Sequence, residues 1–371
     1  MIKNIQIENY KSIRSLDMDM KPINILIGSN GSGKSNFISF FRFLKNICSR
    51  NLQNHIAEEG SCEDFLHFGS KVSDHVRGKI EFNNDEIIVN GSNSINFAYE
   101  FILKPNADSK LFFQDEYAIE IISDEDGICP IKEKISFGSQ MESSLPYFQS
   151  SIGTIVLALM ESYRVYHFHD TGKTSKLRKP AQLNDNEFLR MDGSNLPAFL
   201  YWMQEKHPKE FKKTEMIFRS VAPFFGSFHL RPDKLKEDQI HLRWKEKNPE
   251  VYFGAQHLSD GSLRFLSLVT LLLQPEAPPV IIIDEPELGL HPFAINKLAG
   301  LIKMASSRTQ IIISTQSTEL VDNFDPEDIV TIDRKDNQSI FKRLARTELC
   351  EWINDYTISE LWNKNVVGGR P

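Results

Sequence analysis

The chain has only four cysteines in 371 residues, Cys48, Cys62, Cys129 and Cys350, and no two of them form a CxxC pair. This spacing predicts neither a zinc site nor a disulfide framework, and it favours a reducing compartment such as the cytoplasm. No apolar run approaches the roughly 20 residues that a membrane-spanning helix needs. The first residues also lack the basic and then apolar order of a signal peptide. We therefore expect a soluble, cytoplasmic protein without a membrane partner.

An excess of basic charge is also absent, because 43 lysines and arginines face 50 aspartates and glutamates, which gives a net charge of -7. This balance argues against a uniformly basic nucleic-acid-binding protein but allows a local basic patch. The densest basic stretch is KTSKLRK at residues 173–179. A solvated loop is its default interpretation, and a contact with DNA or a partner protein is the alternative.

A glycine-rich stretch, GSNGSGKSN, follows an apolar run at residues 23–27 and precedes an amphipathic pattern from Ser35 to about Ile47. Its spacing fits GxxxxGK[ST], and the order strand, loop, helix is that of a phosphate-binding P-loop. Glycines let backbone N–H groups form a concave nest for phosphate oxygens. We predict that Lys34 reaches the β- and γ-phosphates and that Ser35 ligates Mg2+. A plain Gly-Ser turn is the alternative. The predicted ATP-binding residues are Gly28, Ser29, Asn30, Gly31, Ser32, Gly33, Lys34, Ser35 and Asn36.

A second metal-binding carboxylate is predicted from VIIIDE at residues 280–285. Four consecutive apolar residues, with isoleucine and valine only, indicate a strand buried on both faces of a parallel sheet. Ligands of open α/β sheets lie at the carboxyl ends of strands, so Asp284 is predicted to bind Mg2+. Glu285 would orient or deprotonate the attacking water. The alternative is that both acids merely end a strand.

Three further motifs carry a resemblance to a known family: LSDGSLR at residues 258–264, ELGLHP at 287–292 and IIISTQS at 311–317. With the P-loop, they resemble the ABC-type ATPase heads of RecF, structural-maintenance-of-chromosomes (SMC) and OLD-type proteins. The resemblance implies that Ser259, Asp260 and Gly261 form a signature motif that contacts the γ-phosphate of ATP in another subunit. An ordinary helix cap is the alternative for these residues.

The position of Gln316 departs from the family pattern, because many ABC-type heads have a histidine there. Glutamine can donate a hydrogen bond but cannot titrate, so we predict a purely hydrogen-bonding catalytic role for Gln316. This departure puts the hydrolysis rate in doubt more than ATP binding. The altered signature motif and the glutamine at position 316 also argue against another hypothesis, that the chain is an ABC importer subunit.

The resemblance is closer to a group of stand-alone bacterial AAA-type, RecF-like ATPases, through YHFHD at residues 166–170, DGSNLPAFLY at 192–201 and the last twelve residues, 360–371. It implies an ATPase that forms a homodimer around two Mg-ATP and acts as a switch in DNA repair or phage defence. DNA and a separate effector protein are its candidate partners. The alternative is a nucleotide-loaded scaffold that regulates a nuclease or toxin.

The predicted fold is an α/β P-loop head with a mixed sheet core, an antiparallel β subdomain and a helical lobe. Residues 1–148 and 275–345 would form lobe I, with an antiparallel meander at 80–122 whose turns lie at 90–92 and 104–106. Residues 149–274 would form a largely helical lobe II, and 346–371 a C-terminal helical extension. Later strands are predicted at 280–284, 310–314 and 329–333, a helix at 293–305 and a helical turn at 319–323.

Two absences limit the architecture. No sustained heptad repeat separates the P-loop from the signature, so long coiled-coil arms are not expected. Only 37 residues, 335–371, follow Arg334, too few for the toprim domain of OLD-type nucleases. Asp17 and Asp19 have the DxD spacing of such a domain, but we expect them on a surface turn. A nuclease activity would then come from a separate protein.

Some remaining residues have two interpretations each. His167 and His169 would face one side of a strand, which suits a metal, although a buried polar network is favoured because no third ligand is identifiable. Lys11 and Arg14 match basic positions that lie near the nucleotide in related heads, or they belong to a solvated strand end. The 26 phenylalanines are predicted to be core residues.

Overall fold

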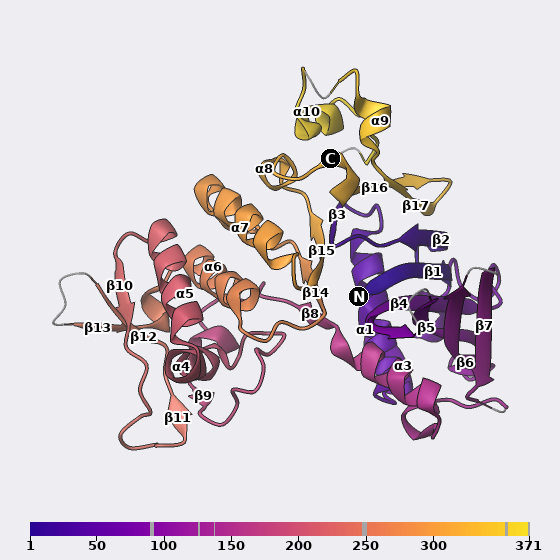
Figure 1. Ribbon diagram of the computed structural model, residues 1–371, viewed down its shortest axis with the longest axis horizontal. Helices are drawn as coiled ribbons and strands as arrows, with labels where there is room; N and C mark the ends of the chain where they lie inside the picture. The colour runs from indigo at the N-terminus through magenta and orange to yellow at the C-terminus, as the bar shows by residue number, and fades with distance from the viewer. Residues whose placement is uncertain (90–92, 125–126, 137, 247–250, 353–354, 370–371) are drawn as a thin grey trace. The chain divides into compact units, whose positions relative to one another are not determined.

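The computed structural model describes residues 1–89, 93–124, 127–136, 138–246, 251–352 and 355–369. The chain forms two compact units, unit 1 with Met1–Tyr163 and Pro326–Pro371, and unit 2 with Arg164–Asp325 (Figure 1). Residues 275–325 thus group with the helical segment, because their strands pair with a strand that begins at Arg164. The predicted division into lobes I and II drew this boundary differently and stays a prediction.

Unit 1 contains a six-stranded antiparallel sheet in the order β2-β1-β4-β5-β6-β7. The predicted meander at residues 80–122 is confirmed and is larger than expected, since two N-terminal strands extend it on one side. The predicted turn at Asn90-Gly91-Ser92 lies outside the described residues. The strands are β1 (Ile2–Tyr10), β2 (Ile13–Asp19), β4 (Val76–Val89), β5 (Asn93–Pro105), β6 (Leu111–Asp124) and β7 (Gly127–Lys134).

Asp17 and Asp19 were predicted on a surface turn, and that prediction is wrong. Both lie on β2, where the Asn4 side-chain amide on β1 donates to their carboxylates at 2.8 and 2.9 Å. The alternation of β2 places Leu16 and Met18 inside and these acids outside. They are cross-strand partners on the exposed face of the sheet.

A second, mixed set of strands in unit 1 carries the P-loop. β3 (Ile23–Ile27) pairs in parallel with β16 (Ile329–Lys335), and β17 (Gln338–Arg343) pairs antiparallel with β16. All five residues of β3 are buried, as expected of an interior parallel strand. The strands predicted at residues 23–27 and 329–333 are therefore confirmed.

Helix α1 (Lys34–Cys48) begins inside the P-loop and packs on both sheets of unit 1 through phenylalanines. The rings of Phe37 and Phe341 on β17 lie 5.6 Å apart, and those of Phe40 and Phe101 on β5 lie 6.4 Å apart. Phe37, Phe40 and Phe101 are almost completely buried, so their predicted core role is confirmed. The same prediction is wrong for four phenylalanines that are 43–52% exposed, Phe68, Phe188, Phe224 and Phe293. The packing of α1 fixes the direction in which its first turn faces the P-loop.

The remaining helices of unit 1 include a C-terminal group. The indole N–H of the buried Trp362 donates to the Gly369 carbonyl oxygen, and the Gly369 N–H donates to the Asp333 carboxylate on β16 at 2.7 Å. The C-terminal segment is therefore anchored to the strand beside β3. These helices are α2 (Leu52–Glu59), α3 (Ser151–Ser162), α9 (Arg346–Leu349) and α10 (Ile358–Asn363).

Unit 2 is built on three parallel strands, in which β14 (Val280–Asp284) pairs with both β15 (Gln310–Thr315) and β8 (Arg164–Tyr166). The first four residues of β14 and all of β15 are buried. The strands predicted at 280–284 and 310–314 and the helix at 293–305 are confirmed to within one residue. The helices are α4 (Leu196–Lys206), α5 (Pro208–Val221), α6 (Asp260–Leu273), α7 (Pro292–Ala305) and α8 (Thr318–Val321).

The prediction that residues 149–274 are largely helical missed a small sheet. β10 (Phe225–Phe228), β12 (Arg243–Glu246) and β13 (Tyr252–Gly254) form an antiparallel sheet, and β9 (Ala181–Gln182) pairs with β11 (Gln239–Ile240). These strands have two to four residues, too few to show a period of two in the sequence.

Candidate functional site

The P-loop between β3 and α1 depends on glycine at two positions. Gly33 has a φ of 119°, and a Cβ atom there would collide with the hydroxyls of Ser339 and Ser12. A Cβ atom on Gly28 would collide with the Ile332 carbonyl oxygen. Both positions therefore exclude any side chain, because the backbone conformation or the packing leaves no room.

Lys34, the first residue of α1, is only 5% exposed. Its ammonium group donates to the carbonyl oxygens of Gly28 at 2.5 Å and Ser29 at 3.0 Å. Neutral backbone carbonyls thus hold the amine within the turn of the loop. A cation held in this way is poised to meet an anion on the same concave backbone.

The first turn of α1 has the features of an anion-binding helix N-terminus. It has neither a side-chain cap nor an acidic residue, and the hydroxyl of Ser32 is buried without a hydrogen-bond partner in the described structure. Ser35 is exposed beside them. These residues fit a triphosphate, because its oxygens would accept from the uncapped amides, Lys34 and Ser32, and the Ser35 hydroxyl is a suitable Mg2+ ligand.

Three residues that brace the P-loop were not found from the sequence. Ser339 on β17 donates to the Ser32 carbonyl oxygen at 2.5 Å and shares a 2.7 Å hydrogen bond with the hydroxyl of Ser12. Arg334 on β16 donates to the Gly31 carbonyl oxygen at 3.3 Å. Ser339 and Arg334 lie 307 and 303 positions from their P-loop partners, and Ser12 lies 24 positions before Asn36, whose side-chain amide donates to it. No pattern within the loop could therefore reveal them.

In unit 2, the carboxyl end of β14 presents the two predicted acids. Asp284 is half-buried and accepts a hydrogen bond from the Ser314 hydroxyl on β15. Glu285 has a φ of 41°, in the left-handed region, and its N–H donates to the Ser314 carbonyl oxygen at 2.9 Å. The side-chain amide of Gln316 donates to the Glu285 carboxylate at 2.7 Å. Non-glycine residues with such backbone strain are concentrated at functional sites.

Glu287 lies behind these acids and was considered only as part of a loop in the sequence. One of its carboxylate oxygens accepts from the Thr315 hydroxyl at 2.5 Å and from the Gln316 N–H at 3.1 Å. The other oxygen is buried without a hydrogen-bond partner in the described structure. Burial raises the pKa of this carboxyl above its ordinary value, although the two hydrogen bonds oppose the shift.

The LSDGSLR motif forms the start of helix α6. The hydroxyl of Ser259 caps the helix by accepting from the Ser262 N–H at 3.1 Å. A Cβ atom on Gly261 would collide with the Gly289 carbonyl oxygen in the loop that follows β14. Ser259 and Asp260 remain exposed. The motif is therefore a capped helix N-terminus that lies against the ELGLHP loop.

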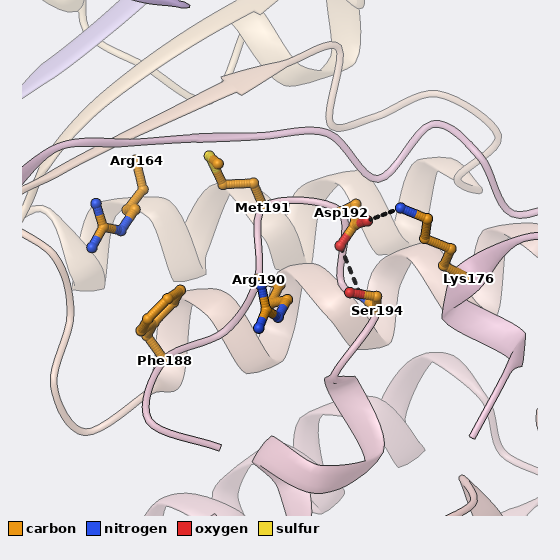
Figure 2. A pocket seen from close by; sticks show the side chains of 7 residues that line it. All are labelled: Arg164, Lys176, Phe188, Arg190, Met191, Asp192 and Ser194. Atoms are coloured by element: carbon orange, nitrogen blue, oxygen red, sulfur yellow. Dashed lines mark hydrogen bonds and ion pairs between the residues drawn. The ribbon is translucent and has the colours of Figure 1, made fainter. Parts of the chain in front are cut away.

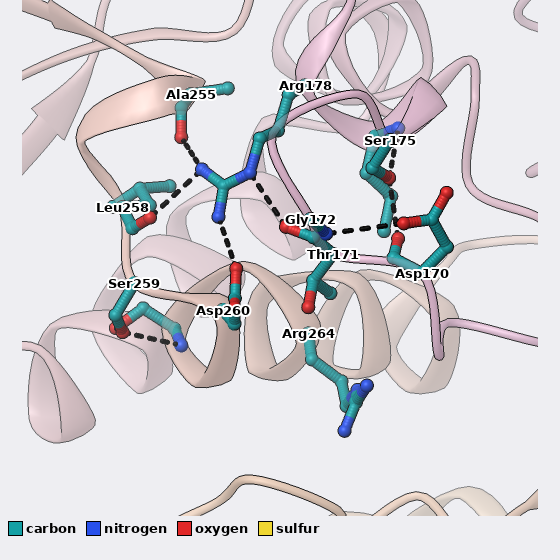
Figure 3. A network of polar contacts seen from close by, with 12 residues as sticks. Asp170, Thr171, Gly172, Ser175, Arg178, Ala255, Leu258, Ser259, Asp260 and Arg264 are labelled. Carbon is teal, nitrogen blue, oxygen red and sulfur yellow. Dashed lines mark hydrogen bonds and ion pairs between the residues drawn. The ribbon is translucent and has the colours of Figure 1, made fainter.

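Arg178 holds the backbone before this helix (Figure 3). One guanidinium nitrogen donates to the carbonyl oxygens of Ala255 and Leu258 at 2.5 and 3.0 Å, and another binds the Asp260 carboxylate at 2.7 Å. The Arg178 side chain is only 9% exposed. The solvated-loop interpretation of residues 173–179 is therefore wrong at Arg178, because its guanidinium binds the backbone and the acid at the start of the LSDGSLR segment.

Arg264 on α6 binds the backbone of the YHFHD segment. Its buried guanidinium donates to the carbonyl oxygens of Phe168 at 2.9 Å, His169 at 2.8 Å and Leu288. Burial lowers the pKa of this guanidinium. Arg264 thus connects α6 to both the YHFHD segment and the ELGLHP loop, and the carbonyl oxygens of these segments satisfy its donors.

The other residues with two interpretations have defined surroundings. The rings of His167 and His169 stack 6.2 Å apart, and the described part of the chain contains no group of three histidine, cysteine, aspartate or glutamate side chains that could hold a metal. Lys11 pairs with Glu59 at 3.1 Å, and Arg14 is exposed. Among the helices in the described ranges, none has the length and apolar character of a membrane span.

A cavity of about 560 Å3 lies in unit 2 beside the DGSNLPAFLY segment (Figure 2). Two of its cations are paired with acids, since Lys176 pairs with Asp192 at 3.1 Å and Arg190 pairs with Asp185 at 2.6 Å. The Arg164 guanidinium lies over the ring of Phe188 at 5.2 Å. Nothing in the sequence pointed to this cavity.

A glycine-rich loop that leads from a buried strand into a helix, within a mixed α/β fold, defines the class of the protein: a P-loop ATPase head of the RecF, SMC and OLD type. Residues 23–322 match the family described as "AAA domain, putative AbiEii toxin, Type IV TA system", and the chain belongs to this family.

Comparison with solved structures shows the same fold. An SMC head in complex with the C-winged helix domain of ScpA has a TM-score of 0.61 and 15% identity, covering 94% of this chain and 99% of that chain. An SMC head with an extended coiled coil, bound to the C-terminal domain of ScpA from Pyrococcus furiosus, has a TM-score of 0.55 and 15% identity, covering 95% and 98%.

Two curated proteins are similar in sequence. The Old nuclease of Escherichia phage P2 is 22% identical over 388 aligned positions, which cover 95% of this chain and 62% of the nuclease. The phosphate import ATP-binding protein PstB of Mycoplasmoides gallisepticum is 31% identical over 123 residues, which cover 28% of this chain and 37% of PstB. The chain thus spans less than two thirds of the length of either relative.

Proposed function

We propose that the protein binds and hydrolyses ATP, and that its P-loop holds the triphosphate. The observation that carries this proposal is the position of Lys34, whose ammonium group is held by the carbonyl oxygens of Gly28 and Ser29 inside a glycine nest. Ser29, Asn30, Gly31, Ser32 and Asn36 complete the proposed loop. Its amides and the dipole of α1 would receive the phosphate oxygens.

The acids at the end of β14 are proposed to act on the same nucleotide. Ser35 and Asp284 would hold Mg2+, which neutralises charge on the phosphates when it is bound. Glu285 would accept a proton from the attacking water, and Gln316 would orient that water by a hydrogen bond. The strained backbone of Glu285 and its contact with Gln316 support this division of roles.

A second copy of the chain is proposed to complete the site. Ser259, Asp260 and Gly261 of that copy would face the γ-phosphate, because they lie at the N-terminus of α6, where Ser259 and Asp260 are exposed. Two heads would then enclose two Mg-ATP, and hydrolysis would separate them. Such a switch suits DNA repair or phage defence.

A second candidate function is a nucleotide-loaded scaffold that regulates a separate nuclease or toxin. The contact between Gln316 and the Glu285 carboxylate favours it, because this amide occupies one of the two carboxylate oxygens that could accept a proton from water. Slow hydrolysis would keep the nucleotide bound. The family description and the similarity to Old nuclease also support a link with an effector.

Replacing the proposed catalytic base tests the switch. Glu285→Gln should abolish ATP turnover while ATP binding persists, so ATP should convert the variant to a stable dimer in multi-angle light scattering. Glu276→Gln, which changes an exposed glutamate in the same unit, should behave like the wild type. A Glu285→Gln variant that turns over ATP normally, or stays monomeric with saturating ATP, would contradict the switch.

Stimulation of turnover separates the two functions. The switch predicts that double- or single-stranded DNA increases ATP turnover. The scaffold predicts that turnover is insensitive to DNA and that a stoichiometric effector is recovered with the protein from its native host. Effector recovery without any DNA effect would therefore favour the scaffold over the switch.

A further inference from the structure

A second cavity in unit 2, which we name the basic cavity, lies where the small sheet β10-β12-β13 meets the segment before α6. It has a volume of about 480 Å3. Basic and aromatic side chains from separate elements converge on it. Those used below are Arg178, His229, His241, Arg243, Tyr252 and His257.

The strand pattern explains why these side chains are on one face. Phe225, Phe228 and Trp244 point inward from the small sheet and are buried. Arg243 and Lys245 alternate with Trp244 on β12 and therefore point outward. Tyr252 lies opposite Lys245 in the register of β12 and β13.

The described residues that line the basic cavity include five basic side chains and no acid. Two acids nearby meet its cations: Asp233 lies 3.4 Å from Arg243 and 3.8 Å from His241, and Asp260 lies 2.7 Å from Arg178. Burial lowers the pKa of His229, and nearby arginines and Lys245 lower it further. The positive potential that opposes a proton on this ring favours an anion beside it. The cavity of Figure 2 differs, because an acid, Asp192, is among its lining residues and pairs with Lys176.

The basic cavity also offers a flat surface. The Tyr252 ring packs against the His229 ring with centroids 4.2 Å apart and planes tilted by 33°, and Tyr252 is 54% exposed. On the other side, the Gly254 N–H donates to Nδ1 of His257 at 3.2 Å, so Nε2 carries the proton of the neutral ring and is a donor. An exposed aromatic ring beside cations is the arrangement that stacks a nucleobase and binds its phosphate.

We propose that the basic cavity binds a nucleotide unit, with its phosphate at Arg243 and the histidines and its base on Tyr252. The unit could be a free nucleotide or part of a single strand, since both present the same phosphate and base. This site is separate from the P-loop and does not rest on the proposed ATPase function. Arg178 lines the cavity and also holds Asp260, so the bound unit would lie beside the residue that orders the start of α6.

Binding is best measured in the Lys34→Ala variant, whose P-loop would no longer compete for nucleotide. Isothermal titration with inorganic phosphate, AMP and a short single-stranded oligothymidylate should detect AMP or the oligomer. Arg243→Gln in this background should weaken that binding about tenfold, the loss of one charge-assisted hydrogen bond. Lys297→Gln, an exposed charge change on α7, should leave it unchanged. Both substitutions are at exposed positions and should leave the fold intact.

Tyr252→Leu distinguishes the base from the phosphate. It should weaken AMP and oligomer binding but leave any phosphate binding unchanged, because only the stacking surface is removed. Binding of the oligomer without AMP assigns the site to a strand, and equal binding of AMP assigns it to a free nucleotide. The proposal is overturned if neither AMP nor the oligomer binds, or if Lys297→Gln weakens binding as much as Arg243→Gln. These results do not depend on whether the wild type hydrolyses ATP.

Discussion

The P-loop in unit 1 and the LSDGSLR motif in unit 2 are stabilised by different kinds of contact. In the P-loop, Lys34 binds carbonyl oxygens five and six positions before it, and glycines remove steric conflict. The LSDGSLR motif depends on Arg178 and Arg264, whose partners lie 77 to 96 positions away, apart from Thr171, at 7, and Leu288, at 24. A short motif encodes most of the first geometry, whereas the second requires the folded unit.

This difference has a consequence for mutation. A change of Lys34 should remove a ligand contact while the fold survives, because the hydrogen bonds of its ammonium group are to backbone atoms of the same loop. A change of either arginine should loosen the LSDGSLR motif, although Arg178 lies outside this motif and Arg264 is its last residue. The following substitutions test this distinction.

Arg264→Ala should have the largest effect on stability. It removes a buried cation and leaves the carbonyl oxygens of Phe168, His169 and Leu288 without their donor, so the free energy of unfolding should fall by about 3 kcal/mol or more. Urea denaturation measures this loss. Arg190→Ala, which removes a half-exposed ion pair, should cost less than about 1 kcal/mol. Similar costs for both would show that Arg264 does not organise the motif.

Arg178→Ala should have an intermediate effect. The loss of its bonds to Ala255, Leu258 and Asp260 should cost about 1–2 kcal/mol, because the exposed Asp260 carboxylate can bind water instead. ATP-dependent dimerisation, measured in the Glu285→Gln background, should weaken while ATP binding to the monomer is unchanged. Arg178→Lys should restore dimerisation only in part, because an ammonium cannot reproduce the guanidinium fork. Unchanged dimerisation in Arg178→Ala would separate this arginine from the signature role.

Glu287→Gln should have the smallest effect, and that effect should depend on pH. The pKa of folded Glu287 is raised above the ordinary 4.5, so the folded state keeps a proton that the unfolded state has lost. Wild-type stability therefore decreases as pH rises from 4.5 through the folded pKa. The variant lacks this loss, which is about 1.4 kcal/mol for each pH unit that separates the folded pKa from the unfolded pKa. Unfolding free energies of the two proteins should diverge across this window, and a constant difference would refute the burial effect.

The sequence predicted the elements whose signals are local. The apolar runs of β3, β14 and β15 and the glycine pattern before α1 identify these elements without knowledge of their neighbours. Phe37 and Phe40 were predicted to be core residues for the same reason, since they recur at helical spacing.

The contacts that fix the candidate site were beyond prediction because they join distant parts of the chain. Nothing near Ser339 or Ser12 indicates a partner in the P-loop, and Arg178 lies in a basic run that resembles a solvated loop. The strands of β10-β12-β13 are too short to show their period, so the basic cavity could not be inferred. Asp17 and Asp19 were misplaced although Leu16 and Met18 alternate with them, because an exposed acid on a strand has the same polarity as one on a turn.

The most direct test of the account is ATP binding by Lys34→Ala, measured by isothermal titration with Mg2+ present. Lys45→Gln, on the same helix, serves as the matched control. The account predicts that Lys34→Ala binds ATP about a hundredfold more weakly, the loss of roughly 2.7 kcal/mol of charge-assisted contact, and that Lys45→Gln binds like the wild type. Equal ATP affinity in Lys34→Ala and the wild type would contradict the assignment of this loop to the triphosphate.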